Sequence, residues 1–224
     1  MRPQNDDSLV AGRIGKYYTF IIADGLPGHP LGGAANEAAV TALSRAIGDA
    51  KGPAKDALAA GVRAADAAVR ELSRKSPGHT GPATKLVTCL IDDNLQVTAL
   101  DTGEGNCHLI TGDTFKNVRE AARSGQPPAA GPAKKSLNEM ISHVLGAPRR
   151  IKDEDFVTFR LGDEFLLLSS DGLTDHLSGQ AIAGIVRGKA ASSLDAAAEA
   201  LVQEAMKAGS EETITVILVH KAPM

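Results

Sequence analysis

The chain has 224 residues, of which 43% are hydrophobic, 3% aromatic and 23% charged, and its formal net charge at pH 7 is -3. This length is enough for one domain with a full core, which must be aliphatic because aromatic residues are scarce. Basic residues are dispersed along the sequence and aromatic residues are scarce, so nucleic-acid binding is not expected. No apolar run approaches the roughly 18 residues that a membrane span needs.

The two cysteines and the first residues indicate the compartment. Cys89 and Cys107 do not form a CxxC pair, which favours two buried, reduced thiols over a disulfide or a redox site. The opening residues, MRPQNDDSLV, are polar and do not have the pattern of a signal peptide. We therefore predict a cytoplasmic protein that does not enter a membrane.

The first part of the chain predicts two pairs of strands separated by two helices. The segments with the composition of strands are residues 8–14, 16–23, 84–91 and 95–101. The alanine-rich segments with helical spacing are residues 34–47 and 52–75. Pro53 stands in the first turn of the second helix, where its missing N–H does no harm. The turn Asp92-Asp93-Asn94 predicts a tight hairpin between the last two strands.

The rest of the chain is less regular. Residues 106–115 predict a strand and a turn, and residues 116–150 predict a mobile excursion between short helices, because SGQPPAAGPAKK cannot form a strand. Within the excursion, residues 136–146 predict a helix that Gly146 closes. The final segments are strands at 155–161 and 164–170 linked by Gly162-Asp163, helices at 178–187 and 192–208, and a strand at 213–221.

Strands thus come in antiparallel hairpins and helices in consecutive pairs. This pattern differs from the alternation of a doubly wound sheet and predicts an α+β fold. With this many strands and four long helices, the expected arrangement is two packed sheets with helices on the outer faces.

Acidic residues stand at the ends of several of these strands. The runs IIADGLPGHPLGG (21–33) and FLLLSSDGLTD (165–175) end buried strands on Asp24 and Asp171, each followed by glycine. Asp6-Asp7 precede the first strand and Glu211-Glu212 precede the last. Taken singly, Asp24 and Asp171 are explained as well by a turn as by a site, and the two acidic pairs are better explained by solvated surface charge. Taken together, the acids favour a site. If they converge, their repulsion requires a counter-charge, for which Mg²⁺ or Mn²⁺ is suited.

The order and composition of these segments resemble the metal-dependent serine/threonine protein phosphatases, the PPM family or protein phosphatase type 2C. The segments that carry the resemblance are RPQNDDS, IIADGLPGHPLGG, LDTGEGNCHLI, FLLLSSDGLTDHLS and GSEETITVILV. They occur in the family's order over nearly the whole chain. The resemblance implies a four-layer αββα sandwich of two antiparallel sheets flanked by helix pairs. It further implies a single domain over residues 1–224 with a variable flap at about 116–150.

The resemblance also implies a metal centre with two Mn²⁺ or Mg²⁺ ions and a weaker third. Asp24 would bridge the two ions, and the carbonyl of Gly25 would bind one of them. The remaining implied metal residues are Asp171 and Glu212 at the first ion, Asp6 and Asp7 at metal-bound waters or an ion directly, and Glu104 at the weaker third ion.

Two further residues have implied roles in hydrolysing phosphoserine and phosphothreonine in proteins. Arg2 would bind the phosphate oxygens with its planar guanidinium group. A serine or threonine alkoxide leaves poorly, so a general acid is needed, and His29 competes with a water for that role. The implied partners are phosphorylated proteins that a serine/threonine kinase produces.

Several positions depart from the family pattern. Glu104 and Glu212 stand where the family has aspartate, Leu26-Pro27 replace Met-Gly, and only Thr84 remains of a Met-Gly-Thr-Thr motif. Every expected ligand position keeps its carboxylate, which favours an active enzyme over a binding or regulatory module with weak or no turnover. Nucleotide binding by the glycines of residues 25–33 is disfavoured, because their spacing is not GxGxxG and prolines interrupt it.

Overall fold

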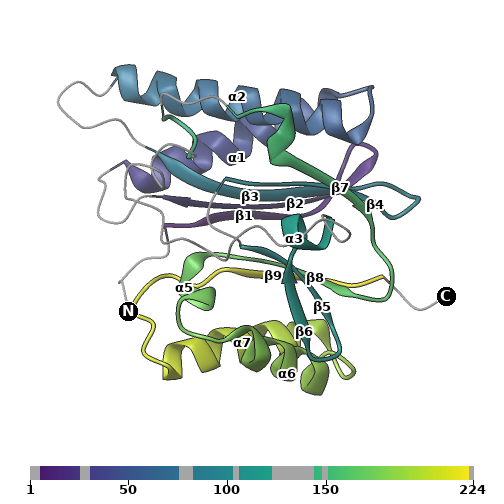
Figure 1. Cartoon of the computed structure of the whole chain (residues 1–224). Coiled ribbons are helices and arrows are strands. Elements are labelled where there is room, and N and C mark those ends of the chain that lie inside the picture. Colours follow the sequence, from purple (N-terminus) through teal and green to yellow (C-terminus); the bar gives the residue numbers. More distant parts are fainter. Residues whose placement is uncertain are drawn as a thin grey trace. The chain divides into compact units, whose positions relative to one another are not determined.

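The computed structural model describes residues 6–25, 31–75, 83–102, 106–122, 144–147 and 151–221. Its contacts divide the chain into two compact units. The described residues before 103 and from 144 to 159 form the first, which we call the five-stranded unit. Residues 106–122 and 160–221 form the second, the four-stranded unit. Figure 1 shows the elements of both.

The five-stranded unit has the strand order β1-β2-β3-β4-β7, and its first four strands pair antiparallel with their neighbours. The strands are β1 (Ser8–Ile14), β2 (Tyr17–Gly25), β3 (Thr84–Ile91), β4 (Gln96–Asp101) and β7 (Phe156–Arg160), the last preceded by a short 3-10 turn (Asp153–Asp155). β2 and β3 are buried along most of their length. Most side chains of these two strands are apolar and are stable only when buried, so the strands lie inside the sheet and not at its edge.

Two helices, α1 (Gly32–Asp49) and α2 (Ala54–Lys75), cover one face of this sheet. Ala35, Ala39, Leu43 and Ile47 recur every four residues along α1 and are each no more than 1% exposed. This spacing places them on one face of the helix, where they join the apolar side chains of β2 and β3 in a single aliphatic core.

The four-stranded unit has the strand order β6-β5-β8-β9, with antiparallel pairing throughout. The strands are β5 (Cys107–Thr111), β6 (Thr114–Asn117), β8 (Phe165–Ser169) and β9 (Val216–Val219). The helices are α3 (Val118–Ala122), α5 (Asp171–Thr174), α6 (Gly179–Lys189) and α7 (Leu194–Lys207). Apolar residues of α6 and α7 pack with Ile110 and Leu167 of the sheet in a second core. The hydroxyls of Ser178 and Ser193 cap these two helices by accepting from Ala181 N and Ala196 N.

The expected α+β class, with antiparallel sheets that each carry a helix pair, is confirmed. Cys89 and Cys107 are free and buried, as expected, and burial raises the pKa of the Cys89 thiol. Among the described helices, none has the length and apolar character required to cross a bilayer.

One sequence-based expectation is wrong, and a second is wrong at the end that the structure describes. The strands at 155–161 and 164–170 do not form a hairpin, because β7 joins the sheet of β4 whereas β8 lies between β5 and β9. The helix expected at 136–146 falls mostly outside the described residues, and its end is not helical. There Leu145 forms a β-bridge with Thr84, although Gly146 does take the positive φ of +87° expected of a helix-closing glycine.

Candidate metal centre

In the four-stranded unit, Asp171 is the first residue of a one-turn helix. β8 ends at Ser169, Ser170 is the N-cap of α5, and Asp175 is its C-cap. The amide of Asp175 donates to the carbonyl of Asp171 at 2.9 Å, which closes the turn. Residues four apart lie on the same face of a helix. The turn therefore presents the carboxylates of Asp171 and Asp175 on one side.

Ser170 and Gly172 hold this turn against the segment that precedes β9. The Ser170 hydroxyl donates to the carbonyl of Thr213 at 3.2 Å and accepts from the amide of Thr215 at 2.9 Å. A Cβ on Gly172 would lie 2.7 Å from the Thr213 carbonyl oxygen, a separation that only glycine permits. The close approach that results brings Glu212 beside α5.

The other side of α5 contacts the start of β5. The hydroxyl of Thr174 donates to Asn106 Oδ1 at 3.2 Å, and the carbonyl of Asn106 accepts from the amide of Ser169 at 3.0 Å. His176 Nδ1 lies 3.2 Å from the carbonyl of Gly172. These contacts fix the one-turn helix at both of its ends, although it is too short to be stable alone.

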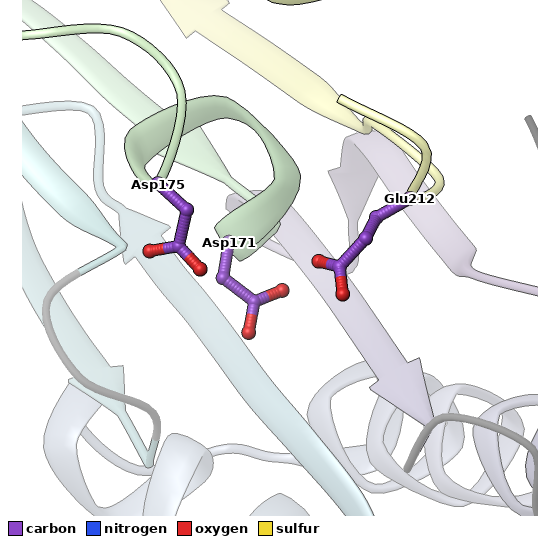
Figure 2. A group of neighbouring side chains, drawn as sticks. All are labelled: Asp171, Asp175 and Glu212. Atoms are coloured by element: carbon purple, nitrogen blue, oxygen red, sulfur yellow. The ribbon is translucent and has the colours of Figure 1, made fainter. Parts of the chain in front are cut away.

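Asp171, Asp175 and Glu212 each offer a carboxylate oxygen, and these three oxygens lie within 4.8 Å of one another. Figure 2 shows the side chains of Asp175 and Glu212 extending toward that of Asp171 from different sides. Asp171 and Glu212 are half-buried and Asp175 is exposed. Three carboxylates at this spacing repel one another. The donor set fits Mg²⁺ or Mn²⁺, which bind carboxylate oxygens and retain several waters.

In the five-stranded unit, Asp24 lies at the end of β2, half-buried and opposite Lys85 of β3. The hydroxyl of Thr84 donates to the carbonyl of Asp24 at 3.1 Å. Gly25 follows in a confined position, where a Cβ would lie 3.0 Å from the Cα of Gly32 and 3.2 Å from Asn36 Nδ2. The sheet and the start of α1 thus fix the backbone on both sides of the Asp24 carboxylate.

Asn36 connects this strand end with the acidic pair before β1. Its side chain is fully buried in α1, and Nδ2 donates to the main-chain carbonyl of Asp6 at 2.7 Å. The Asp6 carboxylate lies beside Gly33, within 3.5 Å of where a Cβ would stand. Asn36 therefore places Asp6 and Gly25 at the same end of α1. Asp7 follows, half-buried, directly before β1.

The expected site residues thus form two groups. Asp171 and Glu212 are brought together in one unit, and Asp6, Asp24 and Gly25 lie around one end of α1 in the other. A joint centre that draws on both units stays a prediction. Arg2, His29 and Glu104 lie outside the described residues, so their roles stay predictions as well.

Sequence reasoning missed two residues. Asp175 has a readable signal, since the segment DGLTD places two acids four residues apart directly after a strand. Asn36 has a weaker one: it is an amide within a run of alanines, at a position that helical spacing assigns to the buried face.

Solved structures share this fold. Stp1 from Staphylococcus aureus superposes with a TM-score of 0.81 at 20% identity, covering 99% of this chain and 91% of that one. The serine/threonine phosphatase of S. agalactiae gives 0.80 at 22% identity, over 98% and 94%. The catalytic domain of the serine/threonine protein phosphatase PstP in complex with two manganese ions gives 0.73 at 21% identity, over 97% and 92%.

Sequence comparison establishes the family. The model for protein phosphatase 2C matches residues 144–214. Protein phosphatase PhpP of Streptococcus pneumoniae serotype 2 (strain D39) is 30% identical over 211 residues, which cover 89% of this chain and 84% of PhpP. The serine/threonine phosphatase Stp of Listeria welshimeri is 25% identical over 213 residues, covering 90% and 83%. The chain belongs to the protein phosphatase 2C family, the PPM serine/threonine phosphatases, and the expected resemblance is confirmed.

Proposed function

We propose that this chain hydrolyses phosphoserine and phosphothreonine in proteins with the help of Mn²⁺ or Mg²⁺. The observation that carries the proposal is the cluster of Asp171, Asp175 and Glu212, whose three residues all lie within the region that matches the phosphatase 2C model. The names of PhpP and Stp support the phosphatase activity. The two manganese ions of the PstP complex support a centre with two ions.

The carboxylates of both units would hold these ions. Asp171 and Glu212 would bind the first, Asp24 would be shared, and the carbonyl of Gly25 would add a neutral oxygen. Asp6 and Asp7 would complete the centre, and Glu104 would contribute to a weaker third ion. When bound, two such ions would lower the pKa of a bound water toward neutrality and so supply the nucleophile.

The chain's own residues would then bind and orient the phosphoprotein. Arg2 would bind the phosphate oxygens through two parallel N–H donors, and His29 would protonate the departing serine or threonine oxygen. Ser170 and Gly172 would keep Asp171 close to Glu212, and Asn36 would keep Asp6 close to Gly25. We place all of these residues in one phosphatase domain spanning residues 1–224, with a variable flap at about 116–150.

Neighbouring glutamates offer a matched test. Glu212 belongs to the carboxylate cluster, whereas Glu211 is exposed and outside it. Hydrolysis of a phosphothreonine peptide is measured with and without Mn²⁺ for the wild type, Glu212→Gln and Glu211→Gln. We expect Glu212→Gln to lower kcat/KM by more than the roughly 10- to 100-fold that loss of an outer-shell partner of a metal site costs. Glu211→Gln is expected to match the wild type.

Asp171→Asn gives the decisive negative control. If the wild type and Asp171→Asn release phosphate equally slowly at saturating Mn²⁺, the phosphatase proposal is wrong. The chain would then be a binding or regulatory module that keeps the family fold without turnover.

A further inference from the structure

Residues 144–147 contact the start of β3 through a β-bridge between Leu145 and Thr84. The amide of Leu145 donates to the carbonyl of Thr84 at 2.9 Å, and the amide of Thr84 donates back to Leu145 at 3.3 Å. Thr84 also pairs with Gly25 of β2 in the sheet register. A strand residue has one partner on each side, so Leu145 occupies the side of β3 along which β4 pairs further on. Thr84 therefore lies between Leu145 and the end of β2.

The Thr84 side chain extends this connection to Asp24. Thr84 is fully buried, and its hydroxyl lies 3.1 Å from the Asp24 carbonyl and 3.0 Å from that of Lys85. The hydroxyl has one proton, which the two carbonyls share, and its bond to Asp24 adds to the strand pairing that sets Lys85 opposite Asp24 and Thr84 opposite Gly25. The position of Thr84 therefore constrains the backbone of Asp24.

Two residues of α2, Asp66 and Arg70, form an ion pair with each other, and each also bonds to the backbone of the same short segment. Asp66 accepts from the amide of Gly146 at 2.8 Å and from Arg70 Nε at 2.8 Å. The guanidinium of Arg70 also donates to the carbonyl of Ala147. Both side chains are about one-third exposed or less, at 26% for Asp66 and 32% for Arg70. Charge-assisted bonds to two successive backbone groups are stronger than neutral ones.

Leu145 adds an apolar anchor beside these polar bonds. Its side chain is fully buried in the core that α1 and α2 share with β2 and β3. Gly146 has a φ of +87°, a conformation that residues with a side chain rarely adopt. The segment is thus held by a side chain in the core, a bridge to β3 and two bonds to α2.

We propose that Asp66 and Arg70 are positioning residues for the metal-binding end of β2. The connection runs from these two residues through residues 145–147 to Thr84, and from Thr84 to the carbonyl of Asp24. We call it the α2 latch. The inference rests on the proposed function, in which Asp24 and Gly25 bind the ions. With the latch intact, the backbone of Asp24 is already held in one position before the ions bind. Ion binding then loses less conformational entropy and is stronger.

The test compares two acid-to-alanine substitutions on the same helix. Asp66→Ala breaks the latch and loses one ion pair within α2. Glu71→Ala loses the exposed pairs with Arg74 and Lys75, which lie one turn further on and contact no other element among the interactions that the structure gives. Alanine has a high helix propensity, so neither substitution weakens α2 through propensity. Arg70→Met is the second variant if Asp66→Ala does not fold, because methionine keeps the stem and the propensity of arginine.

Amide hydrogen exchange, followed by NMR on the full chain without metal, reports the latch directly. In Asp66→Ala we expect the amides of Leu145, Gly146 and Thr84 to exchange at least about tenfold faster than in Glu71→Ala. Unchanged exchange at these amides would show that Asp66 does not hold the segment and would overturn the inference.

Mn²⁺ titration by calorimetry and Mn²⁺-dependent turnover then report the consequence. We expect Asp66→Ala to bind Mn²⁺ about tenfold more weakly than Glu71→Ala, at the low end of what an outer-shell loss costs. Its kcat should recover at high Mn²⁺, which a loss of folded protein would not produce. Equal Mn²⁺ affinity in the two variants would overturn the inference even if turnover is normal. A wild type that binds Mn²⁺ without turnover would overturn the proposed activity, while the calorimetric comparison would still decide the latch.

Discussion

His108 on β5 is a buried histidine with no role in the proposed centre. It is 6% exposed, and its ring stacks on that of Phe115 with centroids 4.0 Å apart. Burial lowers the pKa of His108 from its usual 6.5 to about 4. The unfolded chain therefore binds a proton between these two values that the folded chain does not. Stability is lost as the pH falls through that window and is fully present above it.

We predict that replacing His108 with phenylalanine removes this part of the pH dependence. A shift from 6.5 to about 4 corresponds to about 3 kcal/mol. The free energy of unfolding, measured by urea denaturation at pH 7 and at pH 4, should fall less in His108→Phe than in the wild type. His220→Phe is the control, because His220 also stacks on a phenylalanine, at 4.3 Å, but is partly exposed. Equal losses in the wild type and His108→Phe would contradict the prediction.

At the same scale, the sequence identifies some site residues and not others for a physical reason. Asp24 and Asp171 are readable because an apolar run that ends on Asp-Gly marks the end of a buried strand to within two residues. Asp175 depends on α5, a helix of one turn that the hydrogen bonds of Ser170 and the close approach of Gly172 to Thr213 stabilise. Tertiary contacts of this kind leave no periodic pattern in the chain.

Among the elements, α1 and α2 approach closely at Gly61. A Cβ on Gly61 would lie 2.6 Å from Leu43 Cδ1 and 3.3 Å from the Leu43 carbonyl oxygen. The leucine side chain can move, but the helix backbone cannot without separating the two helices. A larger residue at this position therefore acts on the helix pair as a whole.

We predict that Gly61→Val lowers the free energy of unfolding by about 1–3 kcal/mol, the usual cost of overpacking a core. Gly184→Val in α6 is the matched control, because nothing lies within 4 Å of a Cβ at that glycine. There the change should stay within about 0.5 kcal/mol, since valine and glycine differ little in helix propensity. Urea denaturation measures both. A similar loss in the two variants would show that helix propensity, and not the contact with Leu43, sets the cost.

The sequence predicts the position of a strand along the chain more reliably than the strand with which it pairs. Local periodicity predicts β7 and β8 as strands, but the choice of sheet depends on which apolar face each must bury. Residues 144–147 show the same limit: Gly146 indicates a turn, yet the bridge to Thr84 and the bonds to Asp66 are set by residues about 60 to 80 positions away. No local pattern encodes such contacts.

For the whole molecule, the expected metal-binding acids are divided between two units. The proposed centre can therefore be tested by measuring whether ion binding stabilises each unit. Asp24 belongs to the five-stranded unit and Asp171 to the four-stranded unit. A ligand that binds only the folded state stabilises it by about 2.7 kcal/mol at 100 times its dissociation constant. If the ions draw on both units, each unit should gain protection when Mn²⁺ is added, and each aspartate should be needed.

We therefore predict that saturating Mn²⁺ slows amide exchange in both β3 and β8, and that EDTA reverses the effect. Asp24→Asn should reduce the protection of β8, and Asp171→Asn that of β3, because under the proposal each removes a ligand on which both units would draw. Glu211→Gln, which changes the same type of charge outside the carboxylate cluster, should leave both responses intact. If instead Mn²⁺ protects β8 alone and Asp24→Asn responds like the wild type, the ion is bound by Asp171, Asp175 and Glu212 without Asp24. The proposal of a shared centre would then be wrong, whereas the carboxylate cluster of the four-stranded unit would remain a metal site in its own right.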